Sequence, residues 1–246
     1  MRGDEQSMKV YALLTGRGQN TLQDKNILDI LGRPVLYYPA TAVKESKYIQ
    51  KAYCSSDDDK ILDAAREIGY EPIKRPPELA APTAQHIDCI YHALEIIGQK
   101  EELPDILVVI LANNVTVKTK WVDECIEMMR SDRTVSAVVP VYPDNDHHPF
   151  RAKRMAPSGD LTMFDPSHAA QATSSNRQDL PACYFLAHNF WALNVKTLLD
   201  KDQLGEPPWG FMGKRVKGYK IEESIDIHDL MDIELAKIWL KNNWEH

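Results

Sequence analysis

The sequence has no surplus of positive charge, because 29 Lys and Arg residues stand against 36 Asp and Glu, a formal net charge of -7. A protein that grips nucleic acid along its phosphate backbone needs clustered Lys and Arg, so this balance argues against a nucleic-acid binder. The sequence also lacks a run of about 20 apolar residues, the length that a membrane-spanning helix needs. We therefore expect a soluble protein in which any phosphate-binding groups are confined to one site.

Cysteines are few and scattered, at Cys54, Cys89, Cys125 and Cys183, with no C-x-x-C spacing. This pattern favours neither a disulfide framework nor a structural zinc site. The first residues, MRGDEQS, are polar and no apolar segment of the signal-peptide kind follows them. We expect reduced thiols in a cytoplasmic protein.

Short runs of apolar and β-branched residues alternate with longer segments of helical period, which is typical of a mostly parallel sheet covered on both faces. The chain of 246 residues is long enough for one large α/β domain. The predicted strands are Lys9–Thr15, Ile49–Ser55, Ile106–Ala112 and Thr134–Tyr142, and the predicted helices are Pro34–Lys47, Asp57–Ile68, Ala84–Lys100 and Lys120–Ser131.

This alternation stops after Tyr142, where prolines punctuate short polar segments. We expect an inserted hairpin or arm over about residues 143–182. The chain then returns to a strand at Cys183–Leu193, a strand at Val216–Glu222 and a closing helix from about Asp229 to Asn243. The whole is predicted to be a single three-layer α/β domain, residues 1–246, with a protruding segment.

A loop with features of a phosphate-binding site follows the first predicted strand. It lies at the carboxyl end of that strand, which is where open α/β sheets bind ligands. Gly16 and Gly18 allow close approach of the backbone, and Arg17 with Lys25 supplies two positive charges. The P-loop motif is absent, and Thr21 stands where a dinucleotide fingerprint has its third glycine. A tight turn with two solvated basic residues is the alternative interpretation.

Further motifs follow this loop in order: Leu31–Val35, Cys54–Asp58, Arg75–Asp88, His148–Phe150, Asn176–Pro181 and Ser224–His228. They resemble the L-G-K-P-L, V-S-T-D-D, R-P-x-E-L-A-x-D-T-A-x-S-I-D, H-P-Y, R-R-Q-D-L-P and S-I-D-I-D segments of the N-acylneuraminate cytidylyltransferases and their relatives that activate legionaminic, pseudaminic and deoxyoctulosonic acids. The loop itself resembles that family's R-G-G-S-K-x-x-P-x-K-N. The resemblance spans nearly the whole chain and implies a Rossmann-like nucleotidyltransferase domain.

The resemblance implies transfer of CMP from CTP to a small acidic 2-keto sugar, with release of pyrophosphate. Arg17 and Lys25 would hold the triphosphate and would act in catalysis together with Asp226. The remaining nucleotide-binding positions implied are Gly16, Gly18, Asn26, Ser55, Arg75 and Ala84. Such a reaction needs positioning and neutralisation of phosphate charge more than covalent help from the protein. A solvated loop arginine is the alternative for Arg75.

Asp226 would hold Mg²⁺, a hard cation that selects carboxylate oxygen and bridges to substrate phosphates. The family's second aspartate is His228 in this chain, and Asp229 lies beside it. Because imidazole is a poor ligand for Mg²⁺, His228 could instead orient a water, act as a base or merely begin a helix. Asp229 could be a second metal ligand or an N-cap.

The acceptor pocket departs most from the family. At the tip that follows Ile106–Ala112, relatives carry Q-P-T-S-P-L-R, whereas this chain has Ala112–Lys118, in which Asn113 and Asn114 could bind hydroxyls. Arg177, with Gln178 and Arg154, is the expected partner of the acceptor carboxylate. Alternatively, Arg151, Lys153 and Arg154 form a solvated basic face. The arm resembles the segment through which relatives pair as homodimers.

Two other functions remain open. The altered tip motivates a nucleotidyltransferase with another nucleotide, or with a sugar-phosphate or phosphonate acceptor. His228, together with Pro82 where the family has aspartate, motivates a nucleotide-binding homologue without catalysis.

Overall fold

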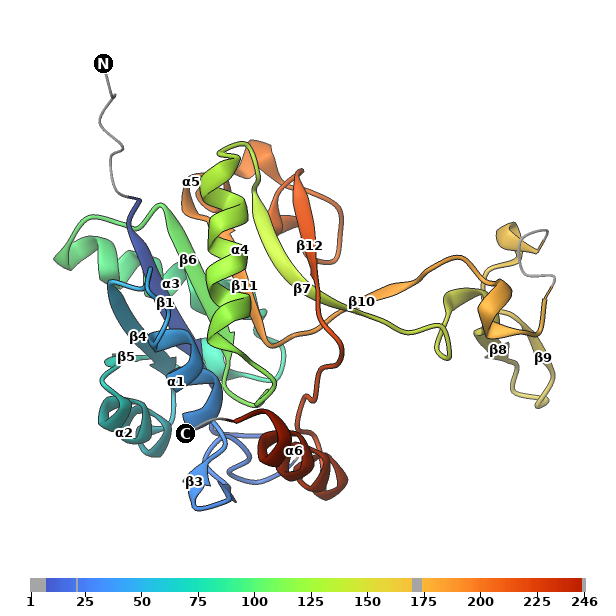
Figure 1. Ribbon diagram of the computed structural model, residues 1–246, viewed down its shortest axis with the longest axis horizontal. Helices are drawn as coiled ribbons and strands as arrows, with labels where there is room; N and C mark the ends of the chain where they lie inside the picture. Colours follow the sequence, from blue (N-terminus) through green and yellow to red (C-terminus); the bar gives the residue numbers. More distant parts are fainter. Residues whose placement is uncertain (1–7, 21, 170–173, 245–246) are drawn as a thin grey trace.

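The computed structural model describes residues 8–20, 22–169 and 174–244, so that Thr21 of the loop and residues 170–173 of the arm lie outside the description. Its centre is an eight-stranded sheet in the order β10-β7-β11-β6-β1-β4-β5, with β12 beside β7 (Figure 1). The strands of this sheet are β1 (Val10–Thr15), β4 (Lys51–Ser56), β5 (Glu71–Lys74), β6 (Ile106–Leu111), β7 (Ala137–Pro143), β10 (Tyr184–Leu186), β11 (Phe190–Asn194) and β12 (Val216–Lys220). Two small hairpins are formed by β2 (Asp29–Ile30) with β3 (Arg33–Pro34) and by β8 (Lys153–Met155) with β9 (Leu161–Met163).

The sheet is mostly parallel, as the sequence predicts. β1 pairs in parallel with both β4 and β6, β4 pairs in parallel with β5, and β12 pairs in parallel with β7. β11 is antiparallel to both of its neighbours, β6 and β7. The chain moves from β1 outward to β4 and β5 and then returns to the other side of β1, so the strand order reverses beside β1. Open α/β sheets bind ligands at such a point.

Helices cover both faces of this sheet: α1 (Tyr37–Lys44), α2 (Asp59–Ile68), α3 (His86–Lys100), α4 (Thr119–Ser131), α5 (Val195–Leu199) and α6 (Leu230–Asn243). Alternate side chains of β1 point to opposite faces. Val10, Ala12 and Leu14 join the core formed with α1, α2 and α4, whereas Tyr11 and Leu13 join the core formed with α3 and α5. The predicted three-layer α/β architecture is confirmed. Among the described helices, none is both long enough and apolar enough to cross a bilayer.

The predicted helix over Pro34–Lys47 is wrong at its start. Pro34 belongs to β3, which folds back on β2 through Leu31 and Gly32, both with positive φ (52° and 84°). The helix begins only at Tyr37. A proline ring suits the first turn of a helix, but it suits an edge strand equally well, and the turn before it decides between them.

The single strand predicted over Cys183–Leu193 is also wrong, because it divides into β10 and β11. His188 lies between them with φ 47°, a conformation in which a strand cannot continue. The side-chain amide of Asn114 donates to the Ala187 carbonyl at 3.0 Å and so occupies the break. β5, a short edge strand, was not predicted from the sequence.

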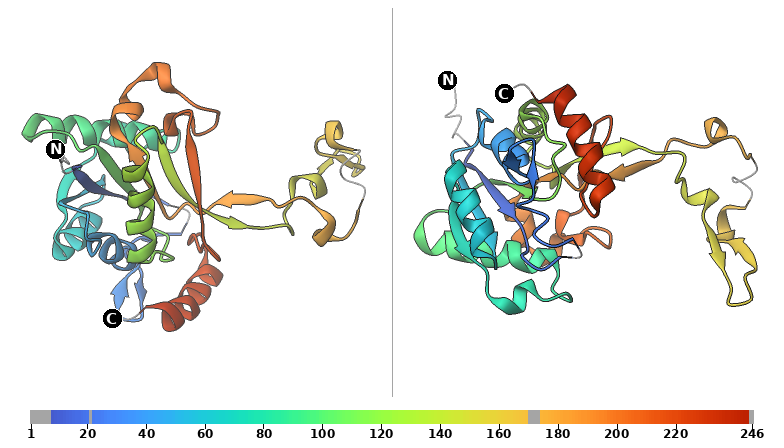
Figure 2. Two further views of the ribbon diagram at one scale, coloured as in Figure 1. Left: turned by 45° about the horizontal axis from the view of Figure 1, so that its top comes forward. Right: turned by 90° about the horizontal axis from the view of Figure 1, so that it is seen from below.

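An extended segment leaves the sheet between β7 and β10. β7 and β10 run out of the sheet as a two-stranded ribbon, and the β8–β9 hairpin lies at its far end, well clear of the rest of the domain (Figures 1 and 2). Met155, Leu161 and Phe164 of this region are 71%, 64% and 56% exposed.

Candidate active site

The carboxyl ends of β1, β4, β5 and β6 meet at one edge of the sheet because these strands are parallel. The loop after β1, Arg75 after β5 and Asn113 after β6 therefore lie around one open cleft. The residues that were predicted from the sequence and line this cleft are Gly16, Arg17, Lys25, Asn26, Arg75, Ala84 and Asn113.

Close backbone contacts hold the loop after β1. The Gly16 amide donates to the Ser55 carbonyl at 3.3 Å, and the Gly18 amide donates to a carboxylate oxygen of Asp57 at 3.0 Å. A Cβ at Gly18 would lie 2.8 Å from the Cβ of Asp58. Asp58 cannot simply move away, because its side chain caps α2. Gly18 is thus required by the packing of the loop on the start of α2.

Asn26 stabilises the loop from within. It is 3% exposed, and its amide donates to the Arg17 carbonyl at 3.0 Å. This contact ties Arg17 to the residue that follows Lys25. The side chain of Ser55 is fully buried beneath the cleft, where its hydroxyl accepts from Arg75 Nε at 3.3 Å.

Three cations face the cleft without an acidic partner. Arg75 is only 6% exposed and donates from Nη2 to the Ser55 carbonyl at 2.8 Å. Arg17 donates to the Ala81 carbonyl at 3.5 Å, and Lys25 donates to the Ile227 carbonyl at 3.1 Å. Within the described residues none of the three forms an ion pair. Since buried cations are normally paired, this cluster suits an anionic ligand.

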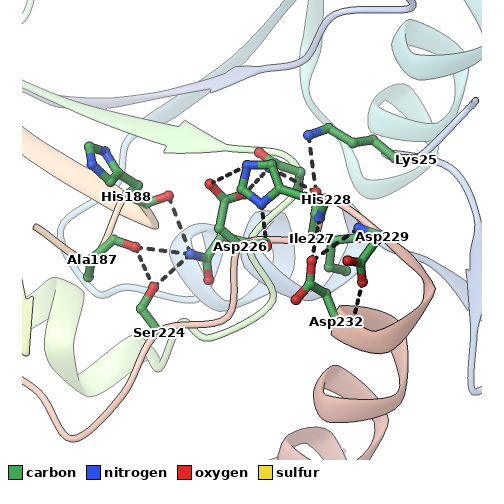
Figure 3. A network of polar contacts seen from close by, with 11 residues as sticks. Lys25, Ala187, His188, Ser224, Asp226, Ile227, His228, Asp229 and Asp232 are labelled. Carbon is green, nitrogen blue, oxygen red and sulfur yellow. Dashed lines mark hydrogen bonds and ion pairs between the residues drawn. The ribbon is translucent and has the colours of Figure 1, made fainter. Parts of the chain in front are cut away.

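Asp226 comes to the same place from near the other end of the chain. Its carboxylate accepts a hydrogen bond from the Asn113 amide, and the two backbones are joined where the Ile227 amide donates to the Asn113 carbonyl at 2.9 Å. Burial raises the pKa of Asp226, and the charges of His228 and Lys25 oppose this shift. Burial likewise lowers the pKa of Lys25, and Asp226 opposes that shift. The lysine and the carboxylate are thus neighbours in one partly desolvated site (Figure 3).

His228 and Asp229 lie where Asp226 leads into α6. The Nε2 of His228 is 3.6 Å from a carboxylate oxygen of Asp226, and its Nδ1 donates to the Asp226 carbonyl at 2.9 Å. Asp229 caps α6 by accepting from the amides of Met231 and Asp232 at 2.8 and 3.1 Å. Figure 3 shows Asp229 beside Asp232 at the start of the helix. The N-cap alternative for Asp229 is therefore the role that the structure shows.

The two asparagines at the tip after β6 point in different directions. Asn113 lines the cleft, but Asn114 is fully buried. The Asn114 amide donates to the Ala187 carbonyl and, at 2.8 Å, to the Ser224 hydroxyl, and its oxygen accepts from the Thr116 amide at 3.0 Å. Its hydrogen-bonding groups thus brace the tip, and of the pair only Asn113 faces a ligand.

The predicted acceptor residues of the arm are not brought to the cleft within one chain. Arg154, Arg177 and Gln178 are all exposed on the arm, which extends away from the sheet (Figure 2). Arg177 donates to a carboxylate oxygen of Asp146 at 2.8 Å, and the Arg154 guanidinium lies 5.5 Å from the centre of the Phe164 ring.

His86 is a cleft residue that the sequence analysis did not select. It begins α3, lines the cleft, and places its Nε2 2.9 Å from the Thr15 hydroxyl. The sequence did mark this position, because His86 replaces a serine of the family motif in the Arg75–Asp88 block. A replaced motif residue does not reveal what the new side chain contacts. Within the described residues no group of three or more His, Cys, Asp or Glu side chains forms a metal site.

Comparison with known proteins places the chain among enzymes that transfer cytidylyl groups. Residues 18–172, more than half of the chain, match the family model described as cytidylyltransferase. A pseudaminic acid cytidylyltransferase of Campylobacter jejuni is 24% identical over 245 residues, which cover 97% of this chain and 99% of the relative. An N-acylneuraminate cytidylyltransferase of Escherichia coli is 24% identical over 93% of this chain and 51% of its own length.

Solved structures share the fold. A CMP:2-keto-3-deoxy-manno-octonic acid synthetase complexed with CTP matches with a TM-score of 0.71 at 14% identity, covering 95% of this chain and 99% of the other. The 4-diphosphocytidyl-2C-methyl-D-erythritol synthase of Anaerococcus prevotii matches with a TM-score of 0.64 at 14% identity, covering 96% and 97% of the two chains.

Proposed function

This chain belongs to the cytidylyltransferase family, and from that membership we propose that it transfers CMP from CTP to an acidic 2-keto sugar of the nonulosonic or deoxyoctulosonic type, with release of pyrophosphate. The observation that carries the proposal is that Arg17, Lys25 and Arg75 line the cleft beside β1, while Asp226 lies next to two further residues of that cleft lining, Asn113 and Lys25. The similarity to a pseudaminic acid enzyme along almost the whole of both chains supports the acceptor class.

In this reaction the acceptor hydroxyl attacks the α-phosphate of CTP and pyrophosphate leaves in line. Arg17 and Lys25 bind the triphosphate, and their positive charges stabilise the negative charge that grows on the leaving pyrophosphate. Arg75, held by Ser55, faces the nucleoside. The cleft preorganises these donors, so little reorganisation is needed when the substrate is bound.

The residues present fit Mg²⁺, which commonly takes one or two protein carboxylates and completes its shell with water and substrate phosphates. Asp226 is a carboxylate at the edge of the cleft, with its side chain 29% exposed and Lys25 as a neighbour. We propose that Asp226 would hold Mg²⁺, and the ion would supply neutralisation of phosphate charge. His228 would orient the carboxylate through its contact with Asp226.

The test is a screen of the four common nucleoside triphosphates against acidic 2-keto sugars and phosphorylated acceptors, with pyrophosphate release as the readout and Mg²⁺ present. We expect release with CTP and an acidic sugar. Preference for another nucleotide, or for a sugar-phosphate or phosphonate acceptor, would replace the proposal by the alternative that the altered tip after β6 motivates. Binding of CTP without turnover with any acceptor would identify a non-catalytic homologue.

We further propose that the active unit is a homodimer in which the arm of one copy completes the cleft of the other. Two observations support this. The arm residues Arg154, Arg177 and Gln178 lie away from the cleft of their own chain, and the far end of the arm exposes apolar side chains. Because all four cysteines are free thiols, we also propose a cytoplasmic location.

Mixing two inactive variants tests the shared cleft. We expect Arg177→Ala to lose binding of the acceptor carboxylate and Asp226→Ala to lose turnover. After unfolding and refolding together, half of the dimers are mixed and one of the two clefts in each is intact, so about a quarter of the wild-type activity should return. Activity of the mixture no higher than that of the separate variants would show that each arm serves its own chain or no cleft at all.

A further inference from the structure

His86 has a fixed hydrogen-bonding direction at the inner wall of the cleft. Its Nε2 lies 2.9 Å from Thr15 Oγ1, and the same hydroxyl lies 3.0 Å from the Ile110 carbonyl. A carbonyl oxygen only accepts, so the single Thr15 hydroxyl proton points at Ile110. The contact with His86 must then be donated by the imidazole, and Nε2 carries a proton.

The other ring nitrogen of His86 is therefore an acceptor. Burial, reinforced by the nearby charges of Arg75 and His188, lowers the pKa of His86 to about 4, so that the ring is neutral at pH 7. In a neutral imidazole with a proton on Nε2, Nδ1 offers a lone pair. The ring also lies against Trp191, with centroids 5.2 Å apart, which restricts its rotation.

Nδ1 of His86 is open to the cleft. No group in the described parts of the chain forms a hydrogen bond with it. In those parts, the side-chain nitrogens and oxygens that are fully buried without a hydrogen-bond partner belong to Thr41, His92 and Trp191. Nδ1 of His86 is not one of them, so it is not sealed inside the protein. The side chain lines the cleft. Nδ1 of His86 is thus a neutral acceptor beside the space that a ligand would occupy, and it can accept a hydrogen bond from that ligand.

The place of His86 in the cleft identifies the donor. In the proposed function Arg17 and Lys25 bind the phosphates, with Asp226 beside Lys25. The wall of the cleft also includes the uncharged Leu79, Ala81, Ala84 and Cys89, and its remaining cation, Arg75, is hydrogen-bonded to Ser55. A pyrimidine base suits such a wall. Of the two pyrimidines, cytosine presents an amino donor at its 4-position and uracil a carbonyl acceptor.

We propose that Nδ1 of His86 accepts a hydrogen bond from the 4-amino group of cytosine, so that His86 selects CTP over UTP, with Thr15 as the residue that positions it. This inference rests on the proposed function, since it assigns the base-reading group of the same cleft. With UTP, the 4-carbonyl of uracil would face Nδ1 of His86, and both of these groups are acceptors. Neither would then have a hydrogen-bond donor.

His86→Gln tests the acceptor while keeping the link to Thr15, because the glutamine amide can donate to the Thr15 hydroxyl as Nε2–H does. We expect the ratio of kcat/KM for CTP to that for UTP to fall by about 10- to 100-fold, chiefly through loss with CTP. The triphosphate of pyrimidin-2-one, which lacks the amino group, should react equally well with both enzymes. An unchanged ratio of CTP to UTP would overturn the inference.

Ribose hydroxyls are also donors, and 2′-deoxy-CTP separates them from the base. If His86 reads the base, the ratio of CTP to 2′-deoxy-CTP is the same in the wild type and in His86→Gln. If that ratio changes and the ratio of CTP to pyrimidin-2-one triphosphate does not, His86 binds the sugar and the proposal is wrong.

Thr15→Val removes the hydroxyl that fixes the ring, and Thr15→Ser restores it. We expect Thr15→Val to lower the CTP to UTP ratio and to remove the excess of the Nε2–H tautomer in the ¹⁵N spectrum of His86, with both recovered in Thr15→Ser. Dissociation constants of the same nucleotides, measured by calorimetry, give the same ratios without turnover. Selective binding of CTP that depends on His86 therefore supports the inference even if no acceptor reacts, and equal binding of CTP and UTP by the wild type refutes it.

Discussion

Asp226→Ala is expected to abolish CTP-dependent pyrophosphate release while leaving the fold intact. The variant removes the carboxylate that would hold Mg²⁺ against the triphosphate, and loss of one such stabilising group costs about 100- to 1,000-fold in kcat or more. The fold should survive because burial already disfavours the charged form of Asp226. Its partner Asn113 retains a contact with the Ile227 carbonyl at 3.4 Å. Turnover and the melting temperature, measured side by side, check both halves of this prediction.

Two further variants make the result specific. Glu223→Gln removes one negative charge from an exposed position three residues away and should leave turnover unchanged. Asp229→Asn keeps an N-cap, because asparagine caps helices about as well as aspartate. Lost turnover at unchanged stability in Asp229→Asn would identify a second metal ligand, and full turnover would leave Asp229 as a cap alone. Normal turnover in Asp226→Ala would remove this carboxylate from the metal site.

The layers of the fold could be predicted because the residues of each strand or helix, taken alone, favour that structure. In β1 and β6 the apolar runs are continuous, as strands buried on both faces require, and the amphipathic period of α2 ends at Gly69, whose φ of 91° suits a helix C-cap. The place of the cleft follows from the same pattern, since the carboxyl ends of parallel strands share an edge.

The elements that could not be predicted depend on partners far away in the sequence. His188 divides β10 from β11 where the side chain of Asn114 binds the Ala187 carbonyl, a contact between residues 73 positions apart. The residue pattern over Cys183–Leu193 does not indicate that contact. In the same way, Pro34 joins a strand because Leu31 and Gly32 turn the chain just before it.

The candidate site also has residues that could be predicted from the sequence and features that could not. Arg17, Lys25, Arg75 and Asp226 belong to motifs whose order in the chain resembles a family. The structure brings the three basic residues to one cleft and Asp226 next to Lys25 and Asn113 at its edge. Which of Asn113 and Asn114 faces that cleft depends on a turn of the backbone that no motif specifies. The direction of the hydrogen bonds of His86 depends on Thr15 and Ile110, from two neighbouring strands, so it becomes visible only in three dimensions.

Lys25→Met is expected to lower kcat/KM for CTP by about 100- to 1,000-fold, because the ammonium group that we propose binds the triphosphate would be lost from a partly desolvated site. Stability should be unchanged or slightly higher. Burial lowers the pKa of Lys25, so folding disfavours its charged form, and methionine keeps the aliphatic stem without that cost. The Ile227 carbonyl, which accepts from Lys25, still accepts from Asn113.

Controls separate the role of the charge from that of the shape of the side chain. Lys25→Arg keeps a cation and should recover part of the activity, whereas Lys60→Met, on a lysine whose side chain is 66% exposed and paired with Asp24, should change neither activity nor stability. The double variant Lys25→Met, Asp226→Asn should lose less than the product of the two single effects, since both groups act on the same phosphates and sense each other's charge. Independent, multiplicative losses would mean that Lys25 and Asp226 do not share a substrate group, and the cleft would then need a different arrangement of CTP.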